Sequence, residues 1–212
     1  TVNGTLTPGI STVKYEATNS AGNINIANTT YNSLLFSYLE TYVLTGNLTD
    51  ANALTGNLII EDDATLDVTT NNYNITLAGN WSNSGIGYFT ARNGTVTFSK
   101  SSGTQTLTSG GTGSSYAFYN LVHSGAGTLQ LVTNNLDING NFTNSAGIFD
   151  TNGKDMTVAG NWTNSATFTA GTRTVTFDSA TTGKTLSGTM TGSSAFYDLT
   201  FATTGSGAWS VS

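Results

Sequence analysis

A six-residue motif occurs three times in this 212-residue chain and restricts the folds that it can adopt. It reads GNWSNS at 79–84, GNFTNS at 140–145 and GNWTNS at 160–165. Around it, short segments such as NITLAG, TVTF, TQTLT and MTVAG alternate apolar and polar residues, and Gly, Asn and Ser separate them. Alternation of this kind predicts β-strands, and Gly, Asn and Ser are common turn residues. The sequence therefore predicts an all-β fold.

The spacing between glycines that precede an asparagine, as in the motif, indicates how the strands are arranged. Gly140 recurs as Gly160, and Gly56 recurs in the same way as Gly79. A coil of about 20 residues with two or three short strands is the repeat of a parallel β-helix, or β-solenoid, and both spacings fit it. We therefore predict one β-solenoid domain over residues 1–212, with roughly ten coils. A β-sandwich is the alternative, although it gives no reason for a motif to recur at this spacing.

A longer repeat of about eighty residues is also present. Three segments align: STVKYEAT (11–18), GTVTFSKS (94–101) and RTVTFDSA (173–180). Each of them is followed by a segment with aromatic residues. Their central valines are Val13, Val96 and Val175. Because a coil takes about 20 residues, each long repeat is expected to contain four coils. Matching residues of the repeats are then expected to pack in equivalent columns of the core, such as Leu121 and Leu199.

The motif aromatics and the single histidine are interpreted in the same way. Trp81, Phe142 and Trp162 are expected to occupy one inward column, with the flanking asparagines at a corner of the coil. His123 is aligned with Leu35 and Thr200 of the other repeats and is therefore interpreted as an ordinary strand position. A lone histidine in a chain without cysteine excludes a zinc site of the usual Cys and His type.

Composition excludes several functions. Only 8% of the residues are charged, against roughly 25% in an ordinary domain, and the six Lys and Arg residues are scattered singly. Nucleic-acid binding requires clustered cations, so no nucleic-acid partner is expected. No apolar run approaches the length that a transmembrane helix needs, so no membrane span is expected. The one acidic cluster, Glu61–Asp63 with Asp67 nearby, is interpreted as a solvated turn rather than a calcium site. No catalytic residues, metal site or cofactor are predicted.

The repeats GNWTNSxTFTAGTxTVTF and FYNLT resemble the Gly-, Asn- and Thr-rich β-helical repeats of large secreted microbial surface proteins. Adhesins, autotransporter-like passengers and cell-wall or S-layer associated proteins contain such arrays. The resemblance implies an extracellular or cell-surface structural protein and transfers no catalytic residues. The alternatives are an adhesin or carbohydrate-binding module and, less favoured, a polysaccharide lyase or hydrolase. We expect no enzyme activity.

Eight Asn-x-Ser/Thr sequons raise the question of glycosylation. Asn80, Asn141 and Asn161 belong to the repeated motif, where an aromatic residue follows the asparagine, and are interpreted first as structural corners. No large aromatic residue follows three other asparagines, which are the better glycosylation candidates: Asn28, Asn74 and Asn93.

The two ends of the chain resemble internal steps of the repeat. GSGAWSVS (205–212) matches GAGTLQLV (125–132), and TVNGTLTPG (1–9) resembles DINGNFTNSAG (137–147). Neither end has the pattern of a cap, which a solitary solenoid needs. We therefore expect the N-terminal coil of one copy to stack on the C-terminal coil of the next and to build a head-to-tail homopolymer. The expected assembly residues are Thr1, Val2, Leu6, Trp209 and Val211.

Overall fold

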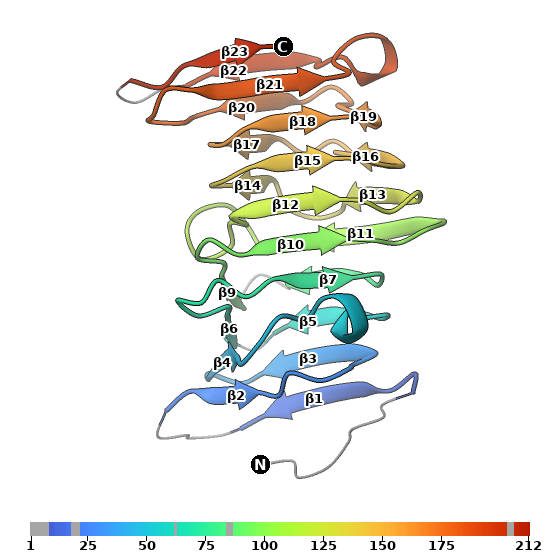
Figure 1. Cartoon of the computed structure of the whole chain (residues 1–212), viewed down its shortest axis with the longest axis vertical. Helices are drawn as coiled ribbons and strands as arrows, with labels where there is room; N and C mark the ends of the chain where they lie inside the picture. The colour runs from blue at the N-terminus through green and yellow to red at the C-terminus, as the bar shows by residue number, and fades with distance from the viewer. Residues whose placement is uncertain (1–8, 18–21, 62, 84–86, 203–205) are drawn as a thin grey trace.

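The computed structural model describes residues 9–17, 22–61, 63–83, 87–202 and 206–212, and they form a stack of parallel β-coils (Figure 1). Each coil turns through three faces, and each strand within a sheet pairs in parallel with the strands of neighbouring coils. The strands are short because the chain must change direction at each corner, where Gly, Asn and Ser supply the turns. The predicted parallel β-solenoid is confirmed.

The first face is an eight-stranded sheet. From the N-terminal end it contains β1 (Thr12–Glu16), β3 (Ser33–Ser37), β5 (Leu58–Ile60), β8 (Trp81–Asn83), β11 (Thr104–Thr108), β13 (Thr128–Leu131), β16 (Ile148–Asp150) and β19 (Thr167–Thr169). A short 3-10 helix, η2 (Gly192–Ser194), contacts β19 at the C-terminal end of this face.

The second face consists of two four-stranded sheets. One contains β2 (Ile24–Ile26), β4 (Thr41–Leu44), β6 (Thr65–Asp67) and β9 (Tyr88–Thr90). The other contains β14 (Leu136–Ile138), β17 (Met156–Val158), β20 (Thr174–Phe177) and β22 (Asp198–Phe201). Residues 115–118 connect the two, since the Phe89 N–H donates to the Ser115 carbonyl and Phe118 forms a parallel bridge with Ile138.

The third face is a seven-stranded sheet. Its strands are β7 (Ile75–Leu77), β10 (Thr95–Phe98), β12 (Asn120–His123), β15 (Phe142–Asn144), β18 (Trp162–Asn164), β21 (Lys184–Gly188) and β23 (Trp209–Val211). Before β7, this face is represented by two isolated bridges, which pair Leu48 with Ile75 and Leu54 with Leu77 on either side of the 3-10 helix η1 (Asp50–Asn52).

The stack has about eight turns rather than the roughly ten expected. The coils of the first face differ in length: Phe149 pairs with Phe168 across a short coil, whereas Trp81 pairs with Leu107 across a longer one. Because corner loops lengthen many coils beyond the expected repeat, the same chain completes fewer turns. At about 4.8 Å per coil, the stack is about 40 Å long.

The core is built from inward-facing residues that form columns along the stack. On the third face, one column runs from Ile75 through Val96, Leu121, Phe142, Trp162 and Leu186, all of them buried. The Phe142 and Trp162 rings lie 4.4 Å apart between centroids. Burying each such side chain contributes about 1.5–3 kcal/mol, so stability is distributed along the whole stack.

The long repeat does not correspond to a whole number of coils. Val13 lies in β1 on the first face, Val96 in β10 on the third face and Val175 in β20 on the second face. From β1 the chain makes three full turns to β8 on the same face, and then two-thirds of a turn through β9 to β10. The path from β10 to β20 has the same length in turns. Each repeat therefore advances three and two-thirds turns, not the four expected.

This phase shift changes two predicted columns. Leu121 and Leu199 match in sequence, but Leu121 lies on the third face and Leu199 on the second. Phe142 and Trp162 share a column as expected, whereas Trp81 is buried on the first face between Leu58 and Leu107. Equivalent residues are displaced by a third of a turn because the repeat length is not a multiple of the coil length.

None of the described residues belongs to a helix long and apolar enough to cross a membrane.

Candidate functional sites

Glycine and asparagine at the start of the motif hold successive coils together. A Cβ on Gly160 would overlap the main-chain carbonyl of Gly140, and one on Gly79 would overlap that of Gly56. Only glycine permits this close approach of two main chains. The nearly regular recurrence of glycine, which indicated the solenoid, thus marks the places where one coil rests directly on another.

The asparagine after this glycine belongs to an outer ladder. On the third face, the Oδ1 atom of Asn141 accepts the N–H of Asn161 at 2.8 Å, and that of Asn161 accepts the N–H of Thr185 at 2.9 Å. On the first face, Asn80 Oδ1 accepts the Thr106 N–H at 2.8 Å. The side chain of each motif asparagine therefore satisfies a main-chain donor one coil further along the stack, as a cap does at a helix end.

The sequon pattern follows from strand alternation. In Asn-Phe-Thr and Asn-Trp-Thr the aromatic residue is buried, and alternation places the asparagine and threonine side by side on the outer face. Because the ladder uses Oδ1, the Nδ2 atom to which a glycan would be attached is not needed for stacking. The ladder and glycosylation are therefore chemically compatible at these asparagines.

The three preferred glycosylation candidates lie in different surroundings. Asn28 is exposed, and its Oδ1 accepts a hydrogen bond from Asn52 Nδ2 at 2.9 Å. Asn74 is half-buried and belongs to the outer ladder, since its Oδ1 accepts the Thr95 N–H at 2.8 Å. Asn93 is exposed in the turn after β9. Asn28 and Asn93 thus present the more accessible side chains.

A second, inner ladder involves the other asparagine of the motif and His123. The three buried side chains are stacked in one column of the third face: His123, Asn144 and Asn164. Asn144 Nδ2 donates to Asn164 Oδ1 and to the Thr167 carbonyl, both at 2.8 Å. Since a carbonyl only accepts, Asn144 Oδ1 must face His123, and the 2.8 Å contact makes His123 Nδ1 the donor.

His123 Nε2 is therefore left as a buried acceptor without a partner among the described residues. Burial lowers the pKa of His123, and the hydrogen bond to Asn144 offsets this only in part. The imidazole is neutral in the folded protein, and protonation would place an unpaired charge in the core.

The repeat alignment misses this role of His123. It matches His123 to Thr200. Aligning FYNLV with FYDLT through Tyr119 and Tyr197 instead matches His123 to Phe201 in sequence. Phe201 has the inward position of its strand, like His123. An alignment anchored on the tyrosines would have identified His123 as a core residue.

The acidic residue Asp67 pairs with an arginine instead of joining Glu61–Asp63. Arg92 Nε and Nη2 donate to the two carboxylate oxygens of Asp67 at 2.8 and 2.7 Å. Burial raises the pKa of Asp67, but the hydrogen bonds from Arg92 and from the Thr69 N–H, together with the charge of Arg92, outweigh it and hold that pKa below its usual value. Among the described residues, no group of three or more His, Asp or Glu side chains is arranged to hold a metal ion.

The C-terminal end of the stack exposes apolar side chains. Leu199, Phe201 and Val211 are 43, 48 and 72% exposed. They continue the inward columns of Val175, Phe177 and Leu186, which are at most 1% exposed. β22 and β23 are the last strands of their sheets, at the top of Figure 1.

The predicted assembly residues are therefore only partly described. Trp209 is half-buried and packs against Phe177 and Phe201, with ring centroids 5.7 and 5.6 Å away, and Val211 is the most exposed of the apolar group. Thr1, Val2 and Leu6 lie outside the described residues.

No protein-family model matches this chain, and neither does any curated protein or solved structure. The resemblance to microbial surface proteins rests on the style of the repeats alone.

Proposed function

We propose that this protein is an extracellular structural protein whose solenoid ends stack head to tail, so that it forms a surface filament or layer. The observation that carries the proposal is the apolar end formed by Leu199, Phe201 and Val211. Exposed apolar surface beside unpaired strand edges favours association with another β-structure.

The first coil of a second copy has a suitable shape for this end. β2 is the terminal strand at the other end of the second face, and its inward residues Ile24 and Ile26 are two positions apart, like Leu199 and Phe201. Stacking β2 on β22 would extend a parallel sheet and place the half-buried Ile24 over Leu199, whereas Ile26 is already fully buried in its own copy and offers no exposed surface to Phe201. A contact between two different ends does not close on itself and therefore produces a filament.

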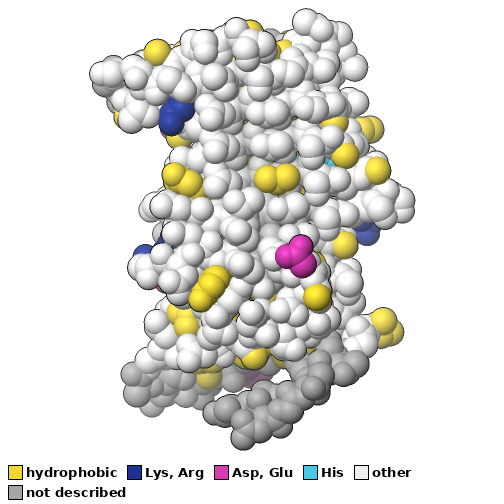
Figure 2. Space-filling model, in the orientation of Figure 1, with side chains coloured by type: hydrophobic (Ala, Val, Ile, Leu, Met, Phe, Trp, Pro, Cys, Tyr) yellow, Lys and Arg dark blue, Asp and Glu magenta, His cyan; other side chains and the backbone are white. Residues whose placement is uncertain are grey.

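Charge does not oppose this arrangement. The chain has only six basic and twelve acidic residues, and the charged side chains are scattered over the face shown in Figure 2. Repulsion between copies is therefore weak. The extracellular location is proposed from the repeat style and the abundance of sequons, which suit a glycosylated surface.

Assembly can be tested by analytical ultracentrifugation and negative-stain electron microscopy. We expect the protein to form rods that lengthen with concentration, and Phe201→Asp to abolish them by placing a charge in the joint. Val132→Asp is the matched control, because Val132 is 38% exposed just after β13, in the middle of the stack and away from both ends. A wild-type protein that stays monomeric at all concentrations, or a Phe201→Asp variant that assembles normally, would contradict the proposal.

A further inference from the structure

The second face contains a break that suggests a binding site on the side of the rod. On this face, the coil between those of β9 and β14 has no regular strand. It loops outward over residues 109–117, where Gly110, Gly111 and Gly113 have positive φ angles (Figure 1). The ladder continues only at single points, including the 2.8 Å bond from the Asn139 N–H to the Phe118 carbonyl.

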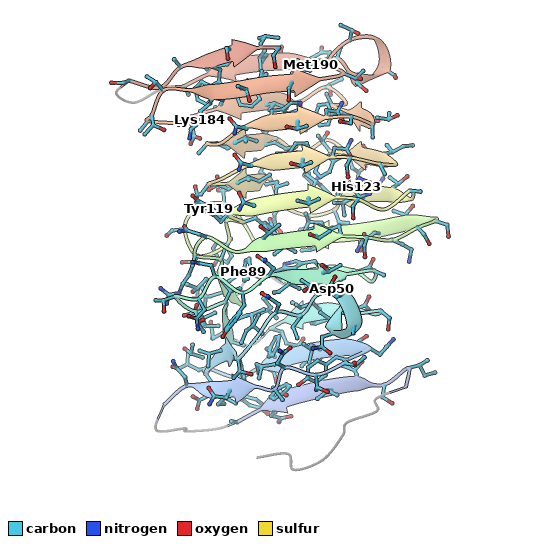
Figure 3. The ribbon with its side chains drawn as sticks, in the orientation of Figure 1. Asp50, Phe89, Tyr119, His123, Lys184 and Met190 are labelled. Carbon is cyan, nitrogen blue, oxygen red and sulfur yellow. The ribbon has the colours of Figure 1, made fainter. Side chains whose placement is uncertain are left out.

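This break leaves a hollow of about 210 Å³. Arg92 lies on one side, Ser114 and Tyr119 belong to the loop and the residues just after it, and Asn139 follows β14. Ala117 and Phe118, both buried, supply an apolar floor. Figure 3 shows Tyr119 and Phe89 on the same side of the stack, away from both ends. The volume lies below the range of about 300–1,000 Å³ for drug-sized ligands and suits a single small ring.

Arg92 is held in a fixed position beside the hollow. Its φ angle of 46° is unfavourable for a residue other than glycine, and its two bonds to Asp67 fix the guanidinium. A guanidinium has five N–H donors, and these two bonds use two of them. The Arg92 side chain is 39% exposed and borders the hollow, so its remaining donors are not all buried.

The other polar side chains around the hollow are also available. Ser114, Tyr119 and Asn139 form no side-chain hydrogen bond with the residues that the structure describes. Tyr119 packs its ring partly against the core. Hydroxyl, amide and guanidinium groups thus surround an apolar floor, and the carboxylate of Asp67 neutralises the charge of Arg92.

We propose that this hollow binds one neutral sugar residue of a glycan. A sugar ring combines apolar C–H faces with hydroxyl groups that donate and accept, and it complements both parts of the lining. An isolated anion is a poorer match because Asp67 already compensates the positive charge. The site lies on the side of the rod, so sugar binding and end-to-end assembly do not compete.

The test is a titration followed by NMR, with methyl glycosides of glucose, galactose, mannose and N-acetylglucosamine, and with glucuronate and sulfate as anionic probes. We expect at least one neutral glycoside to shift resonances of residues around the hollow. Asn139→Ala should weaken its binding about tenfold, and Arg92→Gln at least as much. The exposed Asn25→Ala, at the far end of the second face, should bind as the wild type does.

Arg92→Gln also removes an ion pair, so its folding is checked by circular dichroism, while the exposed Asn139 provides an independent variant. Three results would each overturn the proposal: no binding of any neutral glycoside, a preference for the anions, or binding that Asn139→Ala leaves unchanged.

Discussion

Two successive coils of the second face have the same pattern but opposite exposure. β20 presents Val175 and Phe177 to the core, where they are at most 1% exposed, and β22 presents Leu199 and Phe201, which are 43 and 48% exposed. The residue types are similar, and what differs is the presence of a coil above. In a solenoid, burial depends on position in the stack as much as on sequence.

Truncating one phenylalanine in each coil should give the largest difference. Phe177→Ala leaves a cavity in the core and should lower the free energy of unfolding by about 3–5 kcal/mol. Phe201→Ala, measured in dilute solution, should lower it by only about 1–2 kcal/mol, because that ring is already half in water. Urea unfolding measures both. Equal losses would mean that the two coils are equally covered in dilute solution.

The inner and outer ladders provide a second comparison within one motif. Asn144→Ala removes the buried partner of His123, Asn164 and Thr167, and should lower the free energy of unfolding by about 2–3 kcal/mol. Asn141→Ala removes one acceptor at an exposed corner, where water replaces it, and should lower it by about 1 kcal/mol. Thermal unfolding would test this order, and a larger loss for Asn141→Ala would refute the assignment of the two ladders.

The buried imidazole should make the stability of the middle coils sensitive to acid. Because the pKa of His123 is lowered in the folded protein, only the unfolded chain takes up this proton as the pH falls below about 6.5. Stability should therefore decrease towards lower pH, by at most about 1.4 kcal/mol per pH unit, until the folded-state pKa is reached. At higher pH the contribution is constant.

His123→Leu isolates this effect, because it cannot titrate. The stability of the wild type relative to the variant should decrease from about pH 6.5 downwards, when both are unfolded with urea in parallel. A difference that does not change with pH over this interval would mean that the imidazole accepts a proton equally well in the folded state.

The general fold was predictable from local signals. Alternating strands, turn-forming Gly and Asn, and a short, nearly regular spacing of glycines are properties of each coil, so the parallel β-solenoid followed from them. The number of coils and the phase of the long repeat did not. They depend on the summed length of corner loops such as residues 109–117, which a motif spacing measured elsewhere does not reveal.

The sites were less predictable, because they join residues from different coils. Asp67 and Arg92 are distant in sequence and meet only because two corners stack. The alignment that treats His123 as an ordinary strand position is shifted by one residue, and a shift of one reverses the face of every strand residue. The exposed end was anticipated in part, through Trp209 and Val211, whereas Leu199 was expected to be buried like Leu121.

Hydrogen exchange at the last coil tests the central claim of head-to-tail stacking most directly. The Asp198 and Ala202 N–H groups bond to the coil below, so alternation points the N–H groups of Leu199 and Phe201 towards the open end, and those of Trp209 and Val211 likewise. The Leu199 and Phe201 amides should exchange fast in dilute protein and become protected at high concentration, because β2 of a second copy would pair with β22. The Trp209 and Val211 amides face no described strand of the first coil and serve as an internal reference for fast exchange, while Val175 and Phe177 stay protected throughout. Fast exchange of the Leu199 and Phe201 amides at every concentration would contradict the account.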